Sequence, residues 1–330
     1  MMSSILILNL FSCHAHLDFM FFNPVHCSTV PEDGCVAEGD YWDEVCLTCE
    51  ESYDWTEEFE WMEGTLSDDF PTIQPIQQDQ VEQITIQTND GKGTLDAYYI
   101  PAPQEPIYES IRDILLVYNH GNYAGIEHYV PRLQMLNTIG FPILVWDYRG
   151  YGKTLPDTIP SAEEFLDDAN LIFEQALQYL HSEGNAPTQV LAYGFSLGGI
   201  PAVEMAANNQ KLDSLCGLIL EAGFTSVNQM LQSATSLDMP GGFLTTGNFE
   251  NDQKLEGFAK PFFYMVGDKD HYFPPDISEQ MLEAPTGYSE FWILPDVYHG
   301  ISNKGIPEDS FKNYAEKMHQ FLLNGSCISE

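Results

Sequence analysis

Polar and apolar positions follow regular patterns along the chain from residue 81 onward. Segments 81–88 and 95–102 alternate apolar and polar residues around the polar turn 89–93, which predicts a β-hairpin. Further along, short runs that are apolar throughout alternate with amphipathic stretches of helical period. Apolar runs separated by helices are typical of parallel strands that are covered on both faces. The pattern therefore predicts an α/β fold with a mostly parallel central sheet and helices on both faces.

The expected elements can be assigned to residue ranges. The buried strands are expected over residues 113–120, 141–148, 189–195, 215–224, 261–268 and 290–296. Helices are expected over residues 127–140, 161–184, 197–209 and 307–324. Ser161, with Glu164 three residues later, predicts a capping box at the start of the longest helix. Gly140 and Gly184 are the expected C-terminal stops of the first two helices.

Side chains with catalytic potential follow several of these strands. In a parallel sheet the ligand site lies beyond the carboxyl ends of the strands. Ser196 comes directly after one strand, and Asp268 and Asp270 come at the end of another. His299 lies three residues beyond the last strand. A serine hydroxyl is a weak nucleophile that needs a neighbouring base, oriented by a third group. These four residues are therefore candidates for nucleophilic chemistry at one edge of the sheet.

The segment around Ser196 reads Gly-Phe-Ser-Leu-Gly-Gly and joins a strand to a helix. A sharp turn there would push the hydroxyl out of the sheet, and Gly194 and Gly198 would allow the close backbone approach. The following helix would favour negative charge at its N-terminus. The backbone N–H of Leu197, the residue after the serine, is a candidate donor to a developing oxyanion. By itself the motif also fits a plain turn, but its place between strand and helix favours a nucleophile.

Residues 81–323 resemble the α/β-hydrolase superfamily. The resemblance depends on three segments in the order seen in one branch of that superfamily: His-Gly-Asn at 120–122, Asp-Tyr-Arg-Gly-Tyr-Gly at 147–152 and Gly-x-Ser-x-Gly-Gly at 194–199. It implies the α/β-hydrolase fold.

The resemblance also implies roles for the candidate residues. Ser196 would be the nucleophile and His299 the general base. The superfamily's G-x-x-D pattern implies that Asp270 orients the base, whereas Asp268 is the nearby competitor with turn capping as its alternative role. Asn122 would supply the second backbone donor of the oxyanion hole, beside Leu197.

Two further residues of these motifs are expected to be structural. The resemblance implies that His120 supports the loop that carries Asn122 by hydrogen bonding, and it gives His120 no direct part in catalysis. Arg149 can pair with a carboxylate, and the glycines around it suit a tight turn.

These expectations point to a serine hydrolase that cleaves a small acyl ester through an acyl-enzyme, most simply a carboxylesterase. The mechanism requires no metal and no organic cofactor. Acyl transfer, thioester cleavage and peptide cleavage use the same triad and remain alternatives. A non-catalytic binding protein of the same fold is another, although all three triad positions are filled.

The net charge of the chain argues against some classes of binding partner. Lys and Arg number 12 and Asp and Glu number 50, so the formal net charge is −38. Such a chain repels nucleic acid backbones and anionic lipid headgroups. A solvated acidic surface explains this charge most simply, and no segment has the calcium-loop spacing D-x-[DN]-x-[DN]-G. The composition therefore argues against a nucleic acid partner.

Residues 1–27 are expected to direct export. The apolar run 5–11 is too short to span a bilayer but suits a secretory signal. Ser12 and Cys13 after it resemble a bacterial lipoprotein signal, in which the cysteine is lipidated after cleavage. This predicts an exported protein, with a lipid anchor on Cys13 as one option. Because no basic residue precedes Lys92, an ordinary N-terminal stretch is the alternative.

Cysteines cluster in and beside residues 28–80. Export would favour two disulfides in this acidic segment, with zinc or redox chemistry at the C-x-x-C spacing and free thiols as alternatives. The four cysteines concerned are Cys27, Cys35, Cys46 and Cys49. Cys216, in an apolar strand, is expected to be a buried free thiol.

The chain is thus divided into a leader at 1–27, an extension at 28–80 and a hydrolase domain at 81–330. The extension is expected to pack on the domain through its aromatic residues, which are Tyr41, Trp42, Trp55 and Trp61. A small cap is expected at about 225–258, because this connection is long and its segment 227–249 is rich in apolar residues. The cap would line the substrate pocket; a surface helix packed on the core is the alternative.

Overall fold

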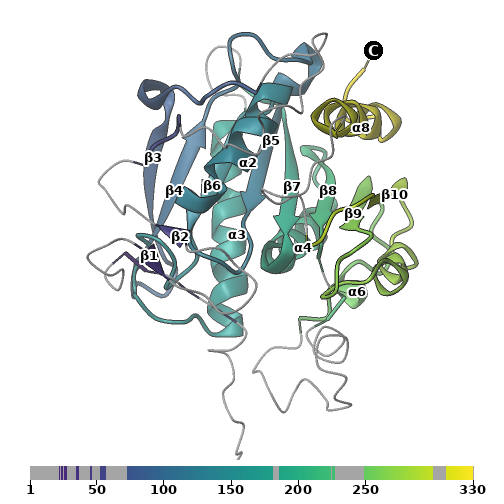
Figure 1. Ribbon diagram of the computed structural model, residues 1–330. Coiled ribbons are helices and arrows are strands. Elements are labelled where there is room, and N and C mark those ends of the chain that lie inside the picture. Colours follow the sequence, from purple (N-terminus) through teal and green to yellow (C-terminus); the bar gives the residue numbers. More distant parts are fainter. Residues whose placement is uncertain are drawn as a thin grey trace, which may run out of the picture.

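The computed structural model describes residues 22, 24, 26–27, 35–36, 45–46, 53–56, 73–180, 186–223, 225–226, 249–299 and 310–329. An eight-stranded sheet forms the centre of this part of the chain, in the order β10-β9-β8-β7-β5-β6-β4-β3 (Figure 1). Its strands are β3 (Glu82–Gln87), β4 (Thr94–Ile100), β5 (Ile114–Asn119), β6 (Ile143–Trp146), β7 (Gln189–Phe195), β8 (Leu215–Glu221), β9 (Phe262–Gly267) and β10 (Ser289–Leu294). The β3–β4 and β4–β6 pairs are antiparallel and the other pairs are parallel. The predicted fold class is therefore confirmed.

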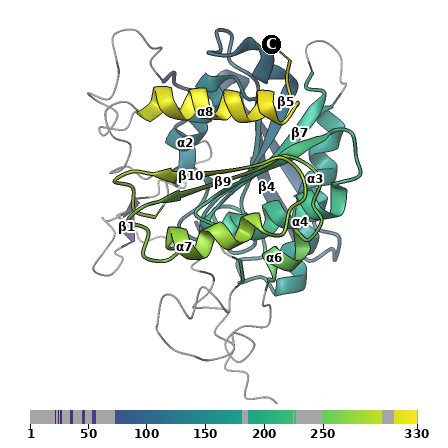
Figure 2. The same ribbon diagram turned by 90° about the vertical axis from the view of Figure 1, so that its right-hand side faces the viewer.

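Helices cover both faces of this sheet. The longer ones are α2 (Ile126–Ile139), α3 (Ala162–Tyr179), α4 (Gly199–Asn209) and α8 (Ser310–Asn324), and the short ones are α6 (Asn251–Lys254) and α7 (Pro275–Ser278). Figure 2 shows α2 and α8 on one side of the sheet and α3, α4 and α6 on the other. The sheet is therefore the middle layer of three.

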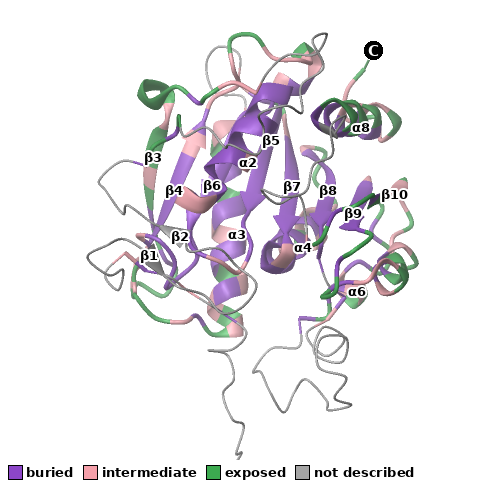
Figure 3. Ribbon diagram, in the orientation of Figure 1, coloured by how far each residue is buried: buried purple, intermediate pink, exposed green. Residues whose placement is uncertain are grey.

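The interior strands form the core. Every residue of β5, β6, β8 and β9 is buried, and so is every residue of β7 after Gln189, whereas β3 at one edge is mostly exposed (Figure 3). Near-continuous apolar sequence is what such doubly covered strands need, because neither face meets water. The C-terminal ends of these buried strands carry the polar residues discussed below.

Local signals in the sequence account for the start of α3 and the end of α2. The capping box of α3 is present: the Ser161 side chain accepts from the Glu164 N–H, and the Glu164 carboxylate accepts from the Ser161 N–H. Gly140 ends α2 with φ at 141°, a conformation that favours glycine.

Two helix boundaries differ from the prediction. Helix α3 ends at Tyr179, not at Gly184, because Leu180 turns to extended backbone and its N–H bonds to the Leu177 carbonyl in a tighter final turn. Helix α4 begins at Gly199, because the strand-to-helix connection first makes the 3₁₀ turn Ser196–Gly198.

The prediction of a free thiol at Cys216 was wrong. Cys216 in β8 forms a disulfide with Cys327, and their Cα atoms are 5.4 Å apart. After α8 ends, the chain turns back through Gly325 and the Cys327 N–H bonds to the Leu322 carbonyl. This turn brings the tail onto the sheet, a proximity that the pattern of a buried strand does not reveal.

Parts of the N-terminal extension lie on the hydrolase domain. Trp55 and Tyr53 are both 1% exposed, and their rings pack 5.2 and 5.4 Å from the ring of Tyr98 in β4. Cys27, the residue just before the extension, is in a disulfide, and its N–H donates to the Gly152 carbonyl. A two-stranded pair, β1 (Cys35–Val36) with β2 (Val45–Cys46), also belongs to the extension. Trp55 therefore contributes to the core of the domain.

Several expectations concern residues outside the described part of the chain. These are the leader with Cys13, the side chains of Tyr41, Trp42 and Trp61, Cys49, and the cap segment 227–248. Within the described residues, none of the helices combines the length and the apolar character that crossing a bilayer requires.

Candidate active site

The turn that carries Ser196 follows directly from β7. Ser196 has φ at +51°, a left-handed conformation that non-glycine residues rarely adopt. A Cβ on Gly194 would come within 2.3 Å of the Gly198 carbonyl oxygen, and one on Gly198 within 2.0 Å of the Asn119 carbonyl oxygen. Both glycines are therefore required for steric reasons. They allow a sharp turn that leaves the serine hydroxyl beyond the end of the sheet.

The structure brings Ser196, His299 and Asp270 together. The Ser196 Oγ lies 2.8 Å from His299 Nε2, and His299 Nδ1 lies 2.9 Å from Asp270 Oδ2. An imidazole protonated at Nδ1 satisfies both contacts, because it donates to the carboxylate and accepts from the hydroxyl. Ser196 lies 103 positions from His299 in the sequence, and Asp270 lies 29 positions from it.

The carboxylate of Asp270 is held from its other side as well. Its Oδ1 accepts the backbone N–H groups of Tyr272 and Phe273, each at 2.9 Å. The side chain of Asp270 is fully buried, and that of His299 is 14% exposed. Asp268, the competitor at the same strand end, is exposed. Of the two aspartates, only Asp270 contacts the histidine.

His120 and Asp147 form a second histidine–carboxylate pair nearby. His120 Nε2 is 3.1 Å from Asp147 Oδ1, and both side chains are fully buried. His120 Nδ1 donates to the Gly121 carbonyl at 2.8 Å. Asp147 Oδ1 also accepts the N–H of Ile126, the first residue of α2. The pair thus ties the loop after β5 to the loop after β6, which is the structural role expected for His120.

The loop that carries Asn122 has one more anchor. The Tyr151 hydroxyl donates to Asn122 Oδ1 at 2.5 Å, so the side chain of Asn122 is engaged with the loop after β6. Leu197, the other expected oxyanion residue, is buried at the start of the turn after Ser196. Asn122 and Leu197 thus belong to the loops after β5 and β7, which are adjacent strands of the sheet.

A buried ion pair supports the nucleophile turn, and the sequence analysis missed it. Arg132 from α2 donates to Glu221 Oε2 at 2.7 Å, and its guanidinium lies 3.9 Å above the ring of Phe195. Tyr193 also donates to Glu221 Oε2, at 2.5 Å. Glu221 ends β8 directly opposite Phe195 in the strand register. An acidic residue at the end of an otherwise apolar strand was the signal that could have revealed it.

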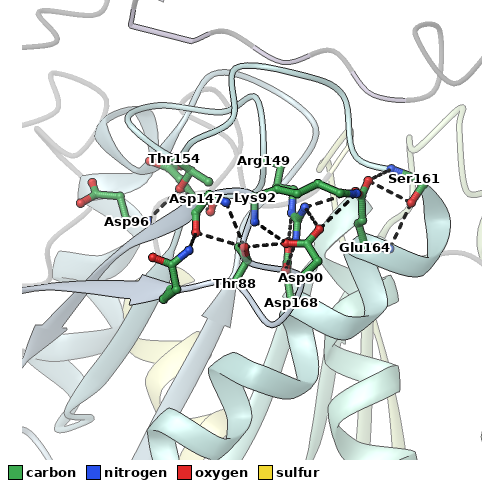
Figure 4. A network of polar contacts seen from close by, with 12 residues as sticks. Thr88, Asp90, Lys92, Asp96, Asp147, Arg149, Thr154, Ser161, Glu164 and Asp168 are labelled. Carbon is green, nitrogen blue, oxygen red and sulfur yellow. Dashed lines mark hydrogen bonds and ion pairs between the residues drawn. The ribbon is translucent and has the colours of Figure 1, made fainter.

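Arg149 has the expected carboxylate partners. Its guanidinium makes two hydrogen bonds to Asp168, at 2.7 and 2.9 Å, and one to Asp90, at 2.7 Å (Figure 4). Hydrogen bonding to Arg149 holds the pKa of Asp90 well below its usual range. The network joins the turn between β3 and β4 to helix α3. Its residues are structural, as predicted for Arg149.

The histidines next to this site are not equivalent to His299. Burial, together with the positive charge of Arg132, lowers the pKa of His128 to about 4, so that this side chain is neutral near pH 7. His271 is exposed, and its ring centroid lies 6.2 Å from that of Tyr298. Neither contacts Ser196 in the structure.

Comparison with known proteins agrees with this architecture. A family model described as serine aminopeptidase, S33, matches residues 111–246. Protein bem46 of Schizosaccharomyces pombe is 31% identical over 202 residues, which are 59% of this chain and 62% of that protein. The chain therefore spans less than two thirds of this relative. The uncharacterized protein YfhR of Escherichia coli is 23% identical over 254 residues, which are 74% of this chain and 81% of that protein.

A solved structure gives the same fold. The esterase Pf2001 of Pyrococcus furiosus superimposes with a TM-score of 0.54 at 15% sequence identity, covering 73% of this chain and 93% of the esterase. The sheet order, the turn around Ser196 and the family model define an α/β hydrolase. The chain has the α/β-hydrolase fold, and its residues 111–246 match a family model of that class.

Proposed function

We propose that the protein is a serine hydrolase that cleaves carboxylic esters through an acyl-enzyme. The observation that carries the proposal is the continuous set of contacts from Ser196 Oγ through His299 to Asp270. The solved neighbour named as an esterase supports the ester class by analogy of fold.

In this mechanism His299 Nε2 takes the proton of the Ser196 hydroxyl as the oxygen attacks the acyl carbonyl. Asp270, fixed by two backbone N–H groups, keeps the imidazole oriented and stabilises the imidazolium that forms. Backbone N–H groups of Leu197 and Asn122 would bind the developing oxyanion, and each donor contributes about 3–4 kcal/mol to such a transition state. His299 then gives its proton to the leaving oxygen, and the same residue activates water for deacylation.

Labelling with a fluorophosphonate probe tests the proposal. Wild-type protein should be labelled, and Ser196→Ala should not, because the probe reacts with an activated serine. Ser161→Ala is the matched control: Ser161 is a helix cap away from His299, so this variant should be labelled like the wild type. Folded wild-type protein that stays unlabelled and hydrolyses no p-nitrophenyl ester would contradict the proposal.

Peptide cleavage is the second candidate, because the matching family model is described as a serine aminopeptidase. It requires the same triad but breaks an amide bond, so that His299 gives its proton to a leaving amine. Parallel assays with p-nitrophenyl esters and amino-acid p-nitroanilides separate the two. Amide turnover that exceeds ester turnover, and that is lost in Ser196→Ala, would favour the peptidase.

Export belongs to the same proposal. Disulfides persist in oxidising compartments, and the structure has one at Cys216–Cys327 and another at Cys27. Alkylation of thiols in protein taken directly from its native cells, followed by mass spectrometry, should find these cysteines unmodified. Alkylated cysteines would argue for a reducing compartment.

A further inference from the structure

Exposed aromatic side chains gather beside the catalytic histidine. Tyr272 is 43% exposed and Tyr298 is 51% exposed, which makes them two of the few large hydrophobic side chains in the described chain that stand well out into solvent. Tyr272 comes two residues after Asp270, and Tyr298 directly precedes His299. Isolated exposed aromatics are common on proteins, so an exposed ring indicates recognition of a ligand only where it also contacts a catalytic group.

Among the described residues, three aromatic rings contact the imidazole of His299, and they differ in exposure. The rings of Phe195 and Phe273 lie 5.5 and 5.3 Å from it and are 7% and 6% exposed. The ring of Tyr272 lies 5.1 Å away, at 65° to the imidazole. The two phenylalanines therefore form the inner wall around His299, and Tyr272 forms the wall that faces solvent.

The chemistry of the proposed reaction says what lies against Tyr272. His299 Nε2, which contacts Ser196 Oγ, also has to donate a proton to the leaving oxygen. That oxygen must come within hydrogen-bonding distance of Nε2, so the group attached to it lies beside the imidazole. The acyl group, in contrast, is bonded to Ser196. A ring that packs on the imidazole and is open to solvent is thus placed to contact the leaving group.

We propose that Tyr272 binds the leaving group, and that the preferred leaving group is an uncharged aromatic alcohol, so that the substrate is an aryl ester. This inference rests on the proposed serine hydrolase function. Aromatic rings favour edge-to-face or offset contacts with one another, which a tyrosine at the rim can provide.

Charge makes an anionic leaving group unfavourable. The chain carries a formal net charge of −38, and Asp268 near the site is exposed. Lys269, the cation beside this aspartate, is paired with Asp296 at 2.7 Å. The field around the site therefore favours a neutral aryl group over a carboxylated one.

Tyr298 provides a matched control. It is slightly more exposed than Tyr272 and lies next to a triad residue in sequence, but its ring lies 6.2 Å from the ring of His271 and 5.6 Å from Lys269 Nζ. Replacing Tyr272 removes only its side chain, so the backbone N–H that donates to Asp270 is retained.

The test compares kcat/KM for phenyl acetate and cyclohexyl acetate in wild type, Tyr272→Ala, Tyr272→Phe and Tyr298→Ala. Both esters give the same acetyl-enzyme and differ only in the leaving group. The phenyl-to-cyclohexyl ratio should fall about two- to tenfold in Tyr272→Ala, the range that one aromatic contact contributes. It should be unchanged in Tyr272→Phe and in Tyr298→Ala. The rate of deacetylation should be the same in all four proteins.

The outcomes separate the proposed role of Tyr272 from the proposed serine hydrolase function. An unchanged ratio in Tyr272→Ala, or an equal fall in Tyr298→Ala, would overturn the role of Tyr272 while ester hydrolysis itself stands. A higher kcat/KM for a carboxylated phenyl ester than for phenyl acetate would overturn the preference for an uncharged group. A wild-type protein that neither reacts with the fluorophosphonate nor releases phenol would overturn the hydrolase function and, with it, this inference.

Discussion

Two histidine–carboxylate pairs lie at the same edge of the sheet, and they differ in what surrounds them. His299 contacts Asp270 at 2.9 Å and His120 lies 3.1 Å from Asp147. His299 is partly exposed and uses its second nitrogen for the Ser196 hydroxyl. His120 is fully buried and uses its second nitrogen for a backbone carbonyl.

The difference teaches that the pair alone does not define a catalytic base. A base needs a proton to remove and access for the substrate. His120 has neither, because the ring of Tyr148 stacks on it at 4.1 Å and the Tyr148 hydroxyl donates to its carbonyl oxygen. Replacing members of the two pairs should therefore affect different measurements.

The largest effect is expected for His299→Ala. Without the base, kcat/KM should fall by about 10⁴-fold or more, as in other serine hydrolases that lose a triad member. The free energy of unfolding should change little, because the side chain is partly exposed. His271→Ala is the control, since His271 is exposed and contacts Tyr298, and its kcat/KM should stay within about twofold of wild type, as is typical for surface changes. Equal losses in both variants would contradict the assignment.

Asp270→Asn should be almost as damaging. The amide can no longer hold the required imidazole tautomer, and a loss of about 10³–10⁴-fold in kcat is typical of this change. Asp268→Asn, two residues away and exposed, should leave kcat nearly unchanged. Steady-state kinetics on one ester substrate distinguishes the two aspartates. A larger loss in Asp268→Asn would identify the acid as Asp268.

His120→Ala should affect stability more than chemistry. Removal of His120 leaves the buried carboxylate of Asp147 with the Ile126 N–H but without its histidine, at a cost of about 3 kcal/mol in the free energy of unfolding. Urea denaturation measures this cost. His319→Ala is the control, because its ring stacks on Tyr108 at 4.0 Å but is only partly buried. If His120→Ala is as stable as that control, the buried pair does not stabilise the fold.

The smallest expected effect is on the pH dependence of stability, and it concerns Asp96, a buried carboxylate that is not paired with a histidine. Burial, with a contribution from nearby Asp147, raises the pKa of Asp96 to about 6, although Gln83 donates to it. Between pH 4 and 6 the unfolded chain has released this proton while the folded protein keeps it, so stability falls as pH rises through that window and levels off above it.

Asp96→Asn should remove this pH dependence. The difference in unfolding free energy between wild type and variant should change by at most about 3 kcal/mol across the window, since one pKa unit corresponds to 1.36 kcal/mol. Chemical denaturation at several pH values measures it. Parallel curves for the two proteins would show that Asp96 has an ordinary pKa in the folded state.

Structural features that depend on local sequence patterns could be predicted from the sequence alone. Fully apolar runs identified the interior strands, and Ser161 with Glu164 identified the start of α3. The steric demand for glycine at 194 and 198 made the nucleophile turn recognisable before its geometry was known. The ends of the strands then indicated which polar residues to consider.

Features that depend on distant contacts were not predictable in this way. Nothing local to Cys216 indicates that a tail 111 residues later returns to β8. Arg132 and Glu221 also come from separate elements, α2 and β8, and lie 89 positions apart in the sequence, so their contact exists only in the folded protein. The contact between Tyr272 and His299 likewise exists only once both of their loops are folded.

The bond between Cys216 and Cys327 has a topological consequence. It closes a covalent ring that contains Asp270 and His299 but leaves Ser196 outside. A protease cut anywhere between the two cysteines, including in the long connection after β8, would leave both fragments attached. The nicked protein would run as one species until a reductant is added, and its base and acid would stay tethered to the strand beside the nucleophile.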